Sequence, residues 1–191
     1  MRLFVAADVS EETRTQIARV RGQIERHMSA RHAPRVTWVK AEIAHVTLRF
    51  IGELAEERMR EVADALGGGF ALPPFDLVFD RLGTFPSGRF PRIIWLGASA
   101  GAAALTELAQ HIGVRLDRLI GPGETREFKA HVTLARVRDP GRHFSWSRTL
   151  SEVKLESTTS HVDHVTLYSS QLSPKGPTYT ALCRAPLGTL E

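Results

Sequence analysis

The four-residue string His-Val-Thr-Leu occurs three times in this chain of 191 residues, at positions 45–48, 131–134 and 164–167. Each copy lies in a short run of alternating apolar residues, which is typical of a β-strand. Because residues i and i+2 of a strand point to the same face, each string presents one imidazole and one hydroxyl on one side and two apolar side chains on the other. Two such strands side by side form a cleft with two histidines and two threonines.

The first two strings occupy matched places in the two halves of the chain. In the first half the pattern predicts strand, helix, strand, helix and strand, and in the second half strand, helix and three strands. This order indicates an α+β fold of two pseudo-repeated lobes, each an antiparallel-rich sheet with helices on its outer side, and an active cleft between them. We expect residues 1–191 to form one bilobal domain.

The individual elements follow from apolar periodicity and from turn residues. The expected strands are 2–9, 45–52, 75–79, 92–96, 131–137, 162–168 and 179–184, and the expected helices are 11–28, 55–66 and 102–119. The glycines and the proline of segment 83–88 predict a turn, and the polar stretch from 142 to 161 predicts a loop. Residues 174–177 are expected to close a hairpin.

The charge and the cysteine content limit the kind of partner and of site. The formal net charge is +4 and the sequence pI is about 9.7, which favours a polyanionic partner. Basic residues gather around the second string: Arg126, Lys129, Arg136, Arg138, Arg142 and Arg148. The lone cysteine, Cys183, excludes an internal disulfide and a multi-cysteine metal site, and we expect it to be a small strand residue. Without a long apolar run or a secretory pattern, we expect a cytoplasmic protein.

Two histidines and two threonines on neighbouring strands suit acid–base chemistry on a phosphate ester. One neutral and one protonated imidazole, from His45 and His131, can activate a water and protonate the leaving oxygen, and the motif does not say which histidine does which. The hydroxyls of Thr47 and Thr133 would hold the non-bridging oxygens as negative charge builds. Two histidines alone make an incomplete zinc site, so we expect no metal and no cofactor. Such a pair predicts a bell-shaped pH profile.

Arginines close to the ends of the first two strings are candidates for phosphate contacts. Arg49 has the strand parity of His45, so a regular strand places it on the cleft side. Arg136 has the opposite parity from His131 and would need a bulge or a strand end to redirect it. The third string, at 164–167, has different surroundings, and we interpret it as a solvent-facing strand that matches the motif by accident.

Several motifs together carry a resemblance to a known family. They are Met-Arg-Leu-Phe-Val-Ala at 1–6, Trp-Val at 38–39, His-Val-Thr-Leu-Arg-Phe-Ile-Gly at 45–52, Leu-Gly-Thr-Phe at 82–85, Ile-Ile-Trp-Leu-Gly at 93–97 and Phe-Lys-Ala-His-Val-Thr-Leu-Ala-Arg at 128–136. The chain resembles the two-histidine phosphoesterases, and among them the RNA 2′,3′-cyclic phosphodiesterases, historically called 2′–5′ RNA ligases. It departs from that family at Ala130, where proline is usual. The third string falls where the family has a closing strand without a catalytic histidine.

The resemblance implies metal-independent hydrolysis of an RNA 2′,3′-cyclic phosphate to a 2′-phosphate, with His45 as proton donor and His131 as proton acceptor. It also points to Arg136 as a phosphate contact. RNA ends or small cyclic nucleotides are the expected substrates, with no membrane partner and a monomer as the default state. Joining or cleaving 2′–5′ linkages, or non-catalytic binding of a nucleotide or RNA, remain alternatives. Phe4, Phe50 and Phe128 are candidates for stacking on a terminal base.

Overall fold

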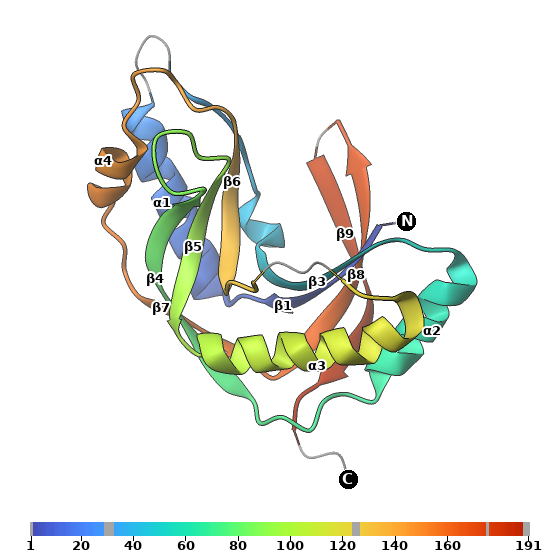
Figure 1. Ribbon diagram of the computed structural model, residues 1–191. Coiled ribbons are helices and arrows are strands. Elements are labelled where there is room, and N and C mark those ends of the chain that lie inside the picture. The colour runs from blue at the N-terminus through green and yellow to red at the C-terminus, as the bar shows by residue number, and fades with distance from the viewer. Residues whose placement is uncertain (1, 29–32, 124–126, 175, 189–191) are drawn as a thin grey trace.

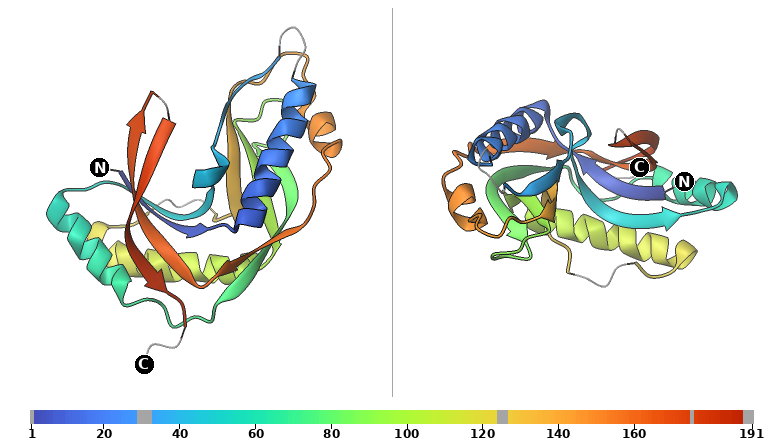
Figure 2. Two further views of the ribbon diagram at one scale, coloured as in Figure 1. Left: turned by 180° about the vertical axis from the view of Figure 1, so that it is seen from behind. Right: turned by 90° about the horizontal axis from the view of Figure 1, so that it is seen from above.

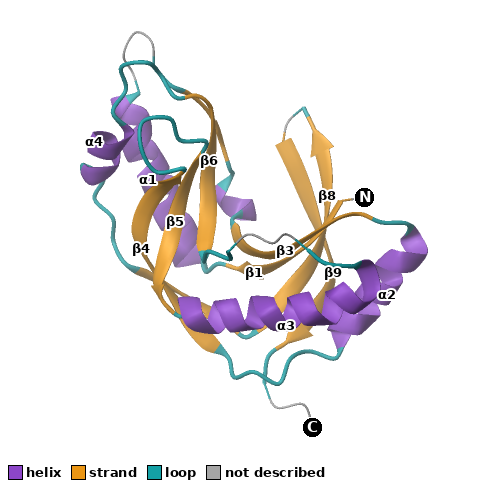
Figure 3. Ribbon diagram, in the orientation of Figure 1, coloured by secondary structure: helices purple, strands orange, loops and turns teal. Residues whose placement is uncertain are grey.

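The computed structural model describes residues 2–28, 33–123, 127–174 and 176–188 as an alternation of strands and helices (Figures 1 and 3). The strands are β1 (Arg2–Asp8), β2 (Arg35–Trp38), β3 (His45–Glu53), β4 (Phe75–Phe85), β5 (Ile93–Ala100), β6 (His131–Asp139), β7 (Thr158–Val162), β8 (His164–Ser173) and β9 (Gly176–Pro186). The helices are α1 (Glu11–His27), the short 3-10 helix η1 (Ala41–Ile43), α2 (Glu56–Gly67), α3 (Ala102–Ile120) and α4 (Trp146–Ser151).

All nine strands belong to one antiparallel sheet in the order β7-β4-β5-β6-β3-β1-β8-β9, with β2 paired to β6. The sheet curls into two arms, one built on β4, β5 and β6 and the other on β3, β1, β8 and β9, and the arms join where β6 pairs with β3 (Figure 1). Seen from behind and from above, α1 and α4 lie along the first arm, α2 lies along the second, and α3 runs across the base from the foot of β5 to α2 (Figure 2). This is the predicted α+β fold with two lobes and outer helices.

Each lobe draws on both halves of the chain. The first arm combines α1 from the first half with β5 and β6 from the second, and the second arm combines β1 and β3 with β8 and β9. The strands β3 and β6 that carry the first two strings are neighbours in the sheet, each at the inner edge of its arm. The crossing of the chain between the lobes therefore brings the two matched strings together.

The helices form where apolar spacing and capping residues predict them. The Ser10 hydroxyl accepts a hydrogen bond from the Thr13 amide at 3.2 Å and caps α1, whose residues Ile17, Val20 and Ile24 are buried at three- and four-residue spacing. In α3 the same spacing buries four side chains completely: Leu105, Leu108, Ile112 and Leu116. The apolar faces of both helices therefore pack into the hydrophobic core.

Two stretches expected to be irregular have regular structure. Strand β4 continues through Gly83 to Phe85, where a turn was expected, because this segment pairs with Trp95 to Ile93 of β5. The stretch 142–161 contains α4, capped by Ser145, and most of β7, which pairs with the edge of β4. Trp146 is 2% exposed and anchors α4 to the core, a contact that polar sequence neighbours conceal. The predicted hairpin joins β8 to β9, although Lys175 within it lies outside the described residues.

The described helices do not include one with the length and apolar character of a membrane span.

Candidate active site

The first two strings meet across the only described β3–β6 pair, in which Val46 lies opposite Val132. Both valines are fully buried, so the residues on either side of them face away from the core. Antiparallel register then places His45 across from Thr133 and Thr47 across from His131. All four side chains are partly exposed on one face of the sheet, which we call the histidine face.

The two imidazoles are held in the same way. His45 Nδ1 lies 2.8 Å from the carbonyl oxygen of Ile43, and His131 Nδ1 lies 2.7 Å from that of Lys129, in each case two residues earlier in the chain. A carbonyl oxygen only accepts, so each Nδ1 carries the proton, and each Nε2 is left as the working nitrogen. His45 Nε2 is 3.1 Å from Thr47 Oγ1. With Nδ1 fixed in this way, the Nε2 atom of a neutral ring can accept a proton and the Nε2 atom of a protonated ring can donate one.

The electrostatic surroundings distinguish the two histidines. Burial lowers the pKa of His45 and of His131 below 6.5, and the carbonyl bonds oppose that shift in both. The pKa of His45 is also raised by the negative charge of Asp8, which lies directly opposite it on β1. This carboxylate therefore favours the protonated form of His45, and His131 has no such contribution.

Asp8 is held by the third string, which corrects its interpretation as a solvent-facing strand. Thr166 is fully buried and donates to Asp8 Oδ2 at 3.1 Å, and Tyr168 donates to Asp8 Oδ1 at 2.7 Å. His164 Nε2 lies 3.7 Å from the same carboxylate. The register places Thr47, Ala6 and Thr166 in one row across β3, β1 and β8, so the third string shares the histidine face.

Two β-bulges decide where the arginines point. The β1–β3 register slips between Thr47 and Arg49, which turns Arg49 off the histidine face. Its guanidinium donates to Asp117 Oδ1 at 2.6 Å and to the Gly121 carbonyl at 3.0 Å, and its side chain is only 13% exposed. The expectation that Arg49 lies on the cleft side is therefore wrong, because it ties β3 to the end of α3.

The matching slip in β6 has the opposite consequence for Arg136. Thr133 pairs with Trp95 but Ala135 pairs with Ile94, so Leu134 is the extra residue of a bulge. After the bulge Arg136 is again on the face of Thr133 and His131, and its side chain is exposed. Its positive charge also acts on Tyr179 of β9, across the histidine face. The strand alternation indicated that Arg136 could reach the cleft side only after a bulge or a strand end, and β6 contains such a bulge.

Aromatic rings flank both histidines. The His45 ring stacks on Phe4 at a centroid distance of 4.9 Å and meets Tyr179 edge-on at 5.4 Å. Phe4 is 5% exposed and has Tyr168 as a further stacking partner, so it supports His45 and has no open face for a base. Of the other two candidate stacking residues, Phe128 packs partly buried against the core, whereas Phe50 is 57% exposed.

His131 has its own aromatic support. Phe85 meets the His131 ring edge-on at 5.1 Å and stacks on Trp95 at 5.1 Å. The Trp95 indole lies flat on the backbone, since a Cβ added at Gly83 would come within 2.3 Å of it and one at Gly97 within 2.6 Å. These two glycines thus make room for the ring that positions Phe85 against the histidine.

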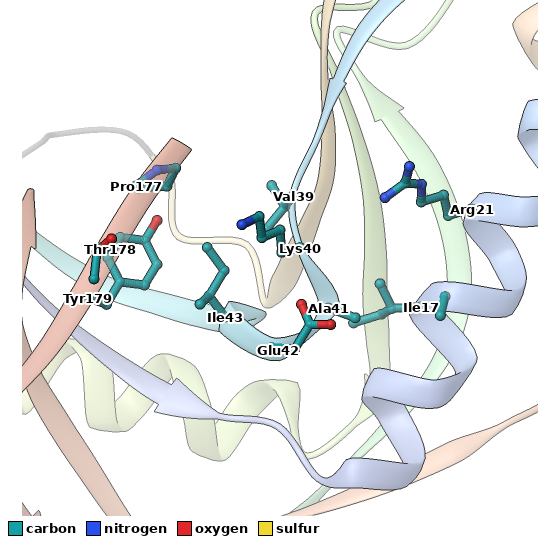
Figure 4. A pocket seen from close by; sticks show the side chains of 11 residues that line it. Ile17, Arg21, Val39, Lys40, Ala41, Glu42, Ile43, Pro177, Thr178 and Tyr179 are labelled. Atoms are coloured by element: carbon teal, nitrogen blue, oxygen red, sulfur yellow. The ribbon is translucent and has the colours of Figure 1, made fainter. Parts of the chain in front are cut away.

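A pocket of about 680 Å³ opens beside His45 (Figure 4). Figure 4 shows Tyr179 from β9 on one side, Arg21 from α1 on the other, and Lys40 and Ile43 between them. Ile43 supplies the carbonyl that holds His45, and Tyr179 contacts the His45 ring. The pocket is therefore lined by two residues that hold the His45 ring. Among the described residues, no three His, Cys, Asp or Glu side chains gather as a metal site would require.

Comparison with known proteins now places the chain. The family model described as LigT like Phosphoesterase matches it twice, over residues 8–95 and 96–179. The chain belongs to this family. The two matches divide it so that each contains one of the first two His-x-Thr strings, which agrees with the pseudo-repeated lobes.

Relatives of this LigT-like phosphoesterase match over nearly its whole length. Proteins named RNA 2′,3′-cyclic phosphodiesterase from Thermotoga maritima and Methanocaldococcus jannaschii are 32% and 29% identical, each over 95% of this chain, and 93% and 98% of the relatives are covered. The crystal structure of TT0787 from Thermus thermophilus superposes with a TM-score of 0.79 at 29% identity, over 97% of both chains. Escherichia coli LigT complexed with 3′-AMP gives a TM-score of 0.74 at 27% identity, over 98% of both.

Sequence reasoning missed several residues around the LigT-like site. Asp8, Tyr168 and Tyr179 come from strands remote in sequence from His45, and only the sheet order brings them beside it. The motifs around Gly83 and Trp95 were part of the family resemblance. The sequence does not show why glycine is needed there, because the packing of the Trp95 ring on the backbone depends on the register of β4 and β5. A signal did exist for Asp8, because an acid at the end of an apolar strand is expected where the strand leaves the core.

Proposed function

We propose that this chain hydrolyses RNA 2′,3′-cyclic phosphate ends to 2′-phosphates, with His45 as proton donor and His131 as proton acceptor. The observation that carries the proposal is the matched pair of imidazoles, each fixed through Nδ1 by a carbonyl and each sharing a strand face with a threonine. The names of the relatives support the reaction class.

The reaction is an in-line displacement at phosphorus. Neutral His131 accepts a proton from water at Nε2 while the water oxygen bonds to phosphorus, and protonated His45 gives the proton on its Nε2 to O3′ as the P–O3′ bond breaks. The product carries a 2′-phosphate and a 3′-hydroxyl. At the end of the cycle His45 is neutral and His131 is protonated, and exchange with solvent restores the starting forms.

Asp8 supports this order of roles. Its charge raises the pKa of His45 against the effect of burial, and Thr166 and Tyr168 keep the carboxylate in place. Burial favours the neutral form of both histidines, and His131 has no carboxylate to oppose that effect. The histidine with the carboxylate is suited to be the acid and the one without is suited to be the base.

The phosphate is bound by groups that share the histidine face. The hydroxyls of Thr47 and Thr133 donate to the non-bridging oxygens, and their bonds strengthen as charge builds on these oxygens. Arg136 supplies positive charge from the same face after the β6 bulge. Arg49 has no part in binding, because its guanidinium is engaged by Asp117 and Gly121.

The ribose lies on the side of His45, because the leaving O3′ belongs to the same sugar that retains the phosphate. The pocket between Tyr179, Lys40 and Arg21 is therefore where the terminal nucleoside is received. The complex of Escherichia coli LigT with 3′-AMP supports a nucleotide ligand for this fold. The chain acts as a monomeric, cytoplasmic, cofactor-free enzyme, a single bilobal domain over residues 1–191.

The decisive experiment is hydrolysis of an oligoribonucleotide ending in a 2′,3′-cyclic phosphate, in excess EDTA, with the product terminus assigned by phosphorus NMR. Formation of a 2′-phosphate is expected. His131→Ala should abolish turnover and leave binding of the oligonucleotide largely intact, and unchanged turnover would overturn the assignment of the base. Joining of 2′–5′ ends instead of hydrolysis would favour the ligase alternative, and binding without either reaction would favour a non-catalytic module.

A further inference from the structure

A second, smaller groove lies at the far end of β5 and β6, beyond the catalytic residues. Its volume is about 450 Å³, and it is lined by Phe90, Pro91, Arg92, Ile93, Arg136, Val137, Arg138 and Pro140. The loop between β4 and β5 lies beside the end of β6 (Figure 1). The Arg92 carbonyl accepts from the Val137 amide at 2.8 Å, which joins the loop to the strand and defines the groove wall.

The charge of this groove is uncompensated. Elsewhere on the surface arginines face carboxylates, as in the pairs Arg19–Glu156 at 2.8 Å and Arg60–Glu56 at 2.6 Å. Within the described ranges, no carboxylate lies within ion-pair distance of the three groove arginines, Arg92, Arg136 and Arg138; Arg138 donates only to the Thr37 hydroxyl at 3.3 Å. Three cations left without counter-charges on one wall form a site for a polyanion.

The groove is continuous with the histidine face through Arg136. This residue lines the groove and, after the bulge at Leu134, shares the face of Thr133 and His131. At about 3.3 Å per strand residue, the groove begins roughly 10 Å from Thr133. A strand whose last phosphate lies at the histidines can therefore enter the groove with the nucleotides next to that end.

The groove also has an aromatic edge. Phe90 is 59% exposed, one of the few large apolar side chains on the described surface, and the Arg89 guanidinium lies 5.3 Å from its ring. A solvent-exposed ring beside arginines is the arrangement on which unpaired bases stack in proteins that bind single strands.

We propose that this groove binds the nucleotides immediately 5′ of the reactive end, with Arg92 and Arg138 on their phosphates and Phe90 against a base, so that the enzyme selects single-stranded RNA over a free cyclic mononucleotide. The proposal rests on the proposed function and adds the substrate class to it.

The test compares kcat/KM for a nucleoside 2′,3′-cyclic phosphate with that for a four-nucleotide RNA bearing the same terminus, over a range of salt concentrations. The wild-type chain should prefer the oligonucleotide, and the double variant Arg92→Ala/Arg138→Ala should lose this preference while its rate on the mononucleotide stays within about twofold. Losing two phosphate contacts should also reduce the slope of log kcat/KM against log salt by about 1.4, at about 0.7 per contact on a single strand. Phe90→Ala should reduce the preference without changing the salt slope.

The matched control is Arg19→Ala/Arg60→Ala, which removes the same charge from α1 and α2, far from the groove. It should behave as wild type on both substrates. Three outcomes would overturn the proposal. The control and the groove variant could lose the preference for the oligonucleotide equally, or the wild type could act on both substrates at equal rates. The groove variant could also lose both rates equally.

Failure of the proposed function gives a different result. If neither substrate is hydrolysed, fluorescence anisotropy still measures the affinity for a labelled RNA that ends in a 3′-phosphate. The groove variant should bind this RNA more weakly than the control. Equal affinity of the two variants would refute the groove independently of the reaction.

Discussion

Substituting Gly83 by alanine should disturb catalysis through a chain of three rings. A methyl group at this position would lie 2.3 Å from Cζ2 of Trp95, and ordinary contact begins at 3.4 Å. The indole must therefore move away from the sheet by more than 1 Å, and it carries Phe85, stacked on it at 5.1 Å, along with it. Phe85 is the edge-on neighbour of His131, so the imidazole that we propose as the base loses its support.

The expected magnitude has two parts. Overpacking of this kind costs about 1–3 kcal/mol, against about 0.4–1 kcal/mol gained because alanine restricts the unfolded chain, so we expect a net destabilisation of about 1–2 kcal/mol. Displacement of a reacting group by about 1 Å lowers the rate by up to about 100-fold, and this loss should fall on kcat. Urea unfolding measures the first part, and steady-state hydrolysis of the cyclic phosphate measures the second.

Two controls separate the ring displacement from a general effect of alanine. Gly113→Ala, in the middle of α3 with open space around its Cβ position, should stabilise the protein by about 0.5–1 kcal/mol and leave kcat unchanged. In a Trp95→Leu background, which removes the ring, Gly83→Ala should cost less than in the wild type. Equal costs in the two backgrounds, or wild-type stability and rate for Gly83→Ala alone, would refute the reasoning.

The charges around the histidines and the cap of α1 give three further predictions. Asp8→Asn removes the carboxylate that raises the pKa of His45, so the alkaline limb of the kcat/KM profile should move to lower pH while the acidic limb stays, and Asp163→Asn should leave both limbs in place. Because burial lowers the folded-state pKa of His45 and His131, the unfolded chain binds more protons below pH 6.5. The free energy of unfolding should therefore fall as pH decreases from 6.5 toward the folded-state pKa values. This pH dependence should be weaker in His45→Gln/His131→Gln, and an identical slope would contradict the linkage. Ser10→Ala should destabilise the protein by about 0.5–2 kcal/mol in thermal or urea unfolding, because the α1 cap to Thr13 is lost, and a change of a few tenths would show that water replaces it.

The parts of the site that the sequence predicted depend on the simplest property of a strand. The alternation of side chains places His45 with Thr47 and His131 with Thr133, and the buried valines between them leave no other register. The same parity rule gave the wrong side for Arg49, because one bulged residue reverses every side chain after it. No residue type at Leu48 or Leu134 announces a bulge, so its position depends on the pairing with β1 and β5.

The fold was predictable where local signals agree and not where pairing overrides them. Helices α1 and α3 have caps or regular apolar spacing, and each predicted helix differs from the observed one by a single residue at its C-terminal end. The extension of β4 through Gly83 required a partner strand, β5, and the burial of α4 required the Trp146 contact. These interactions join residues distant in sequence, and a glycine or a polar neighbour gives the opposite local signal.

The three identical strings show that the chemistry of His-x-Thr is decided outside the string. His45 and His131 each donate a hydrogen bond from Nδ1 to the carbonyl oxygen two residues earlier, which leaves Nε2 for a substrate. His164 instead has Nδ1 2.6 Å from the Asp163 carboxylate and Nε2 3.7 Å from Asp8, so both of its nitrogens face protein groups. With Asp163 before it, the third string has the same four residues as the proposed proton-transfer strings but supports Asp8 instead. Replacing Asp163 therefore changes the hydrogen-bonding of His164 and does not supply a third catalytic histidine, because Asp8 still occupies its other nitrogen.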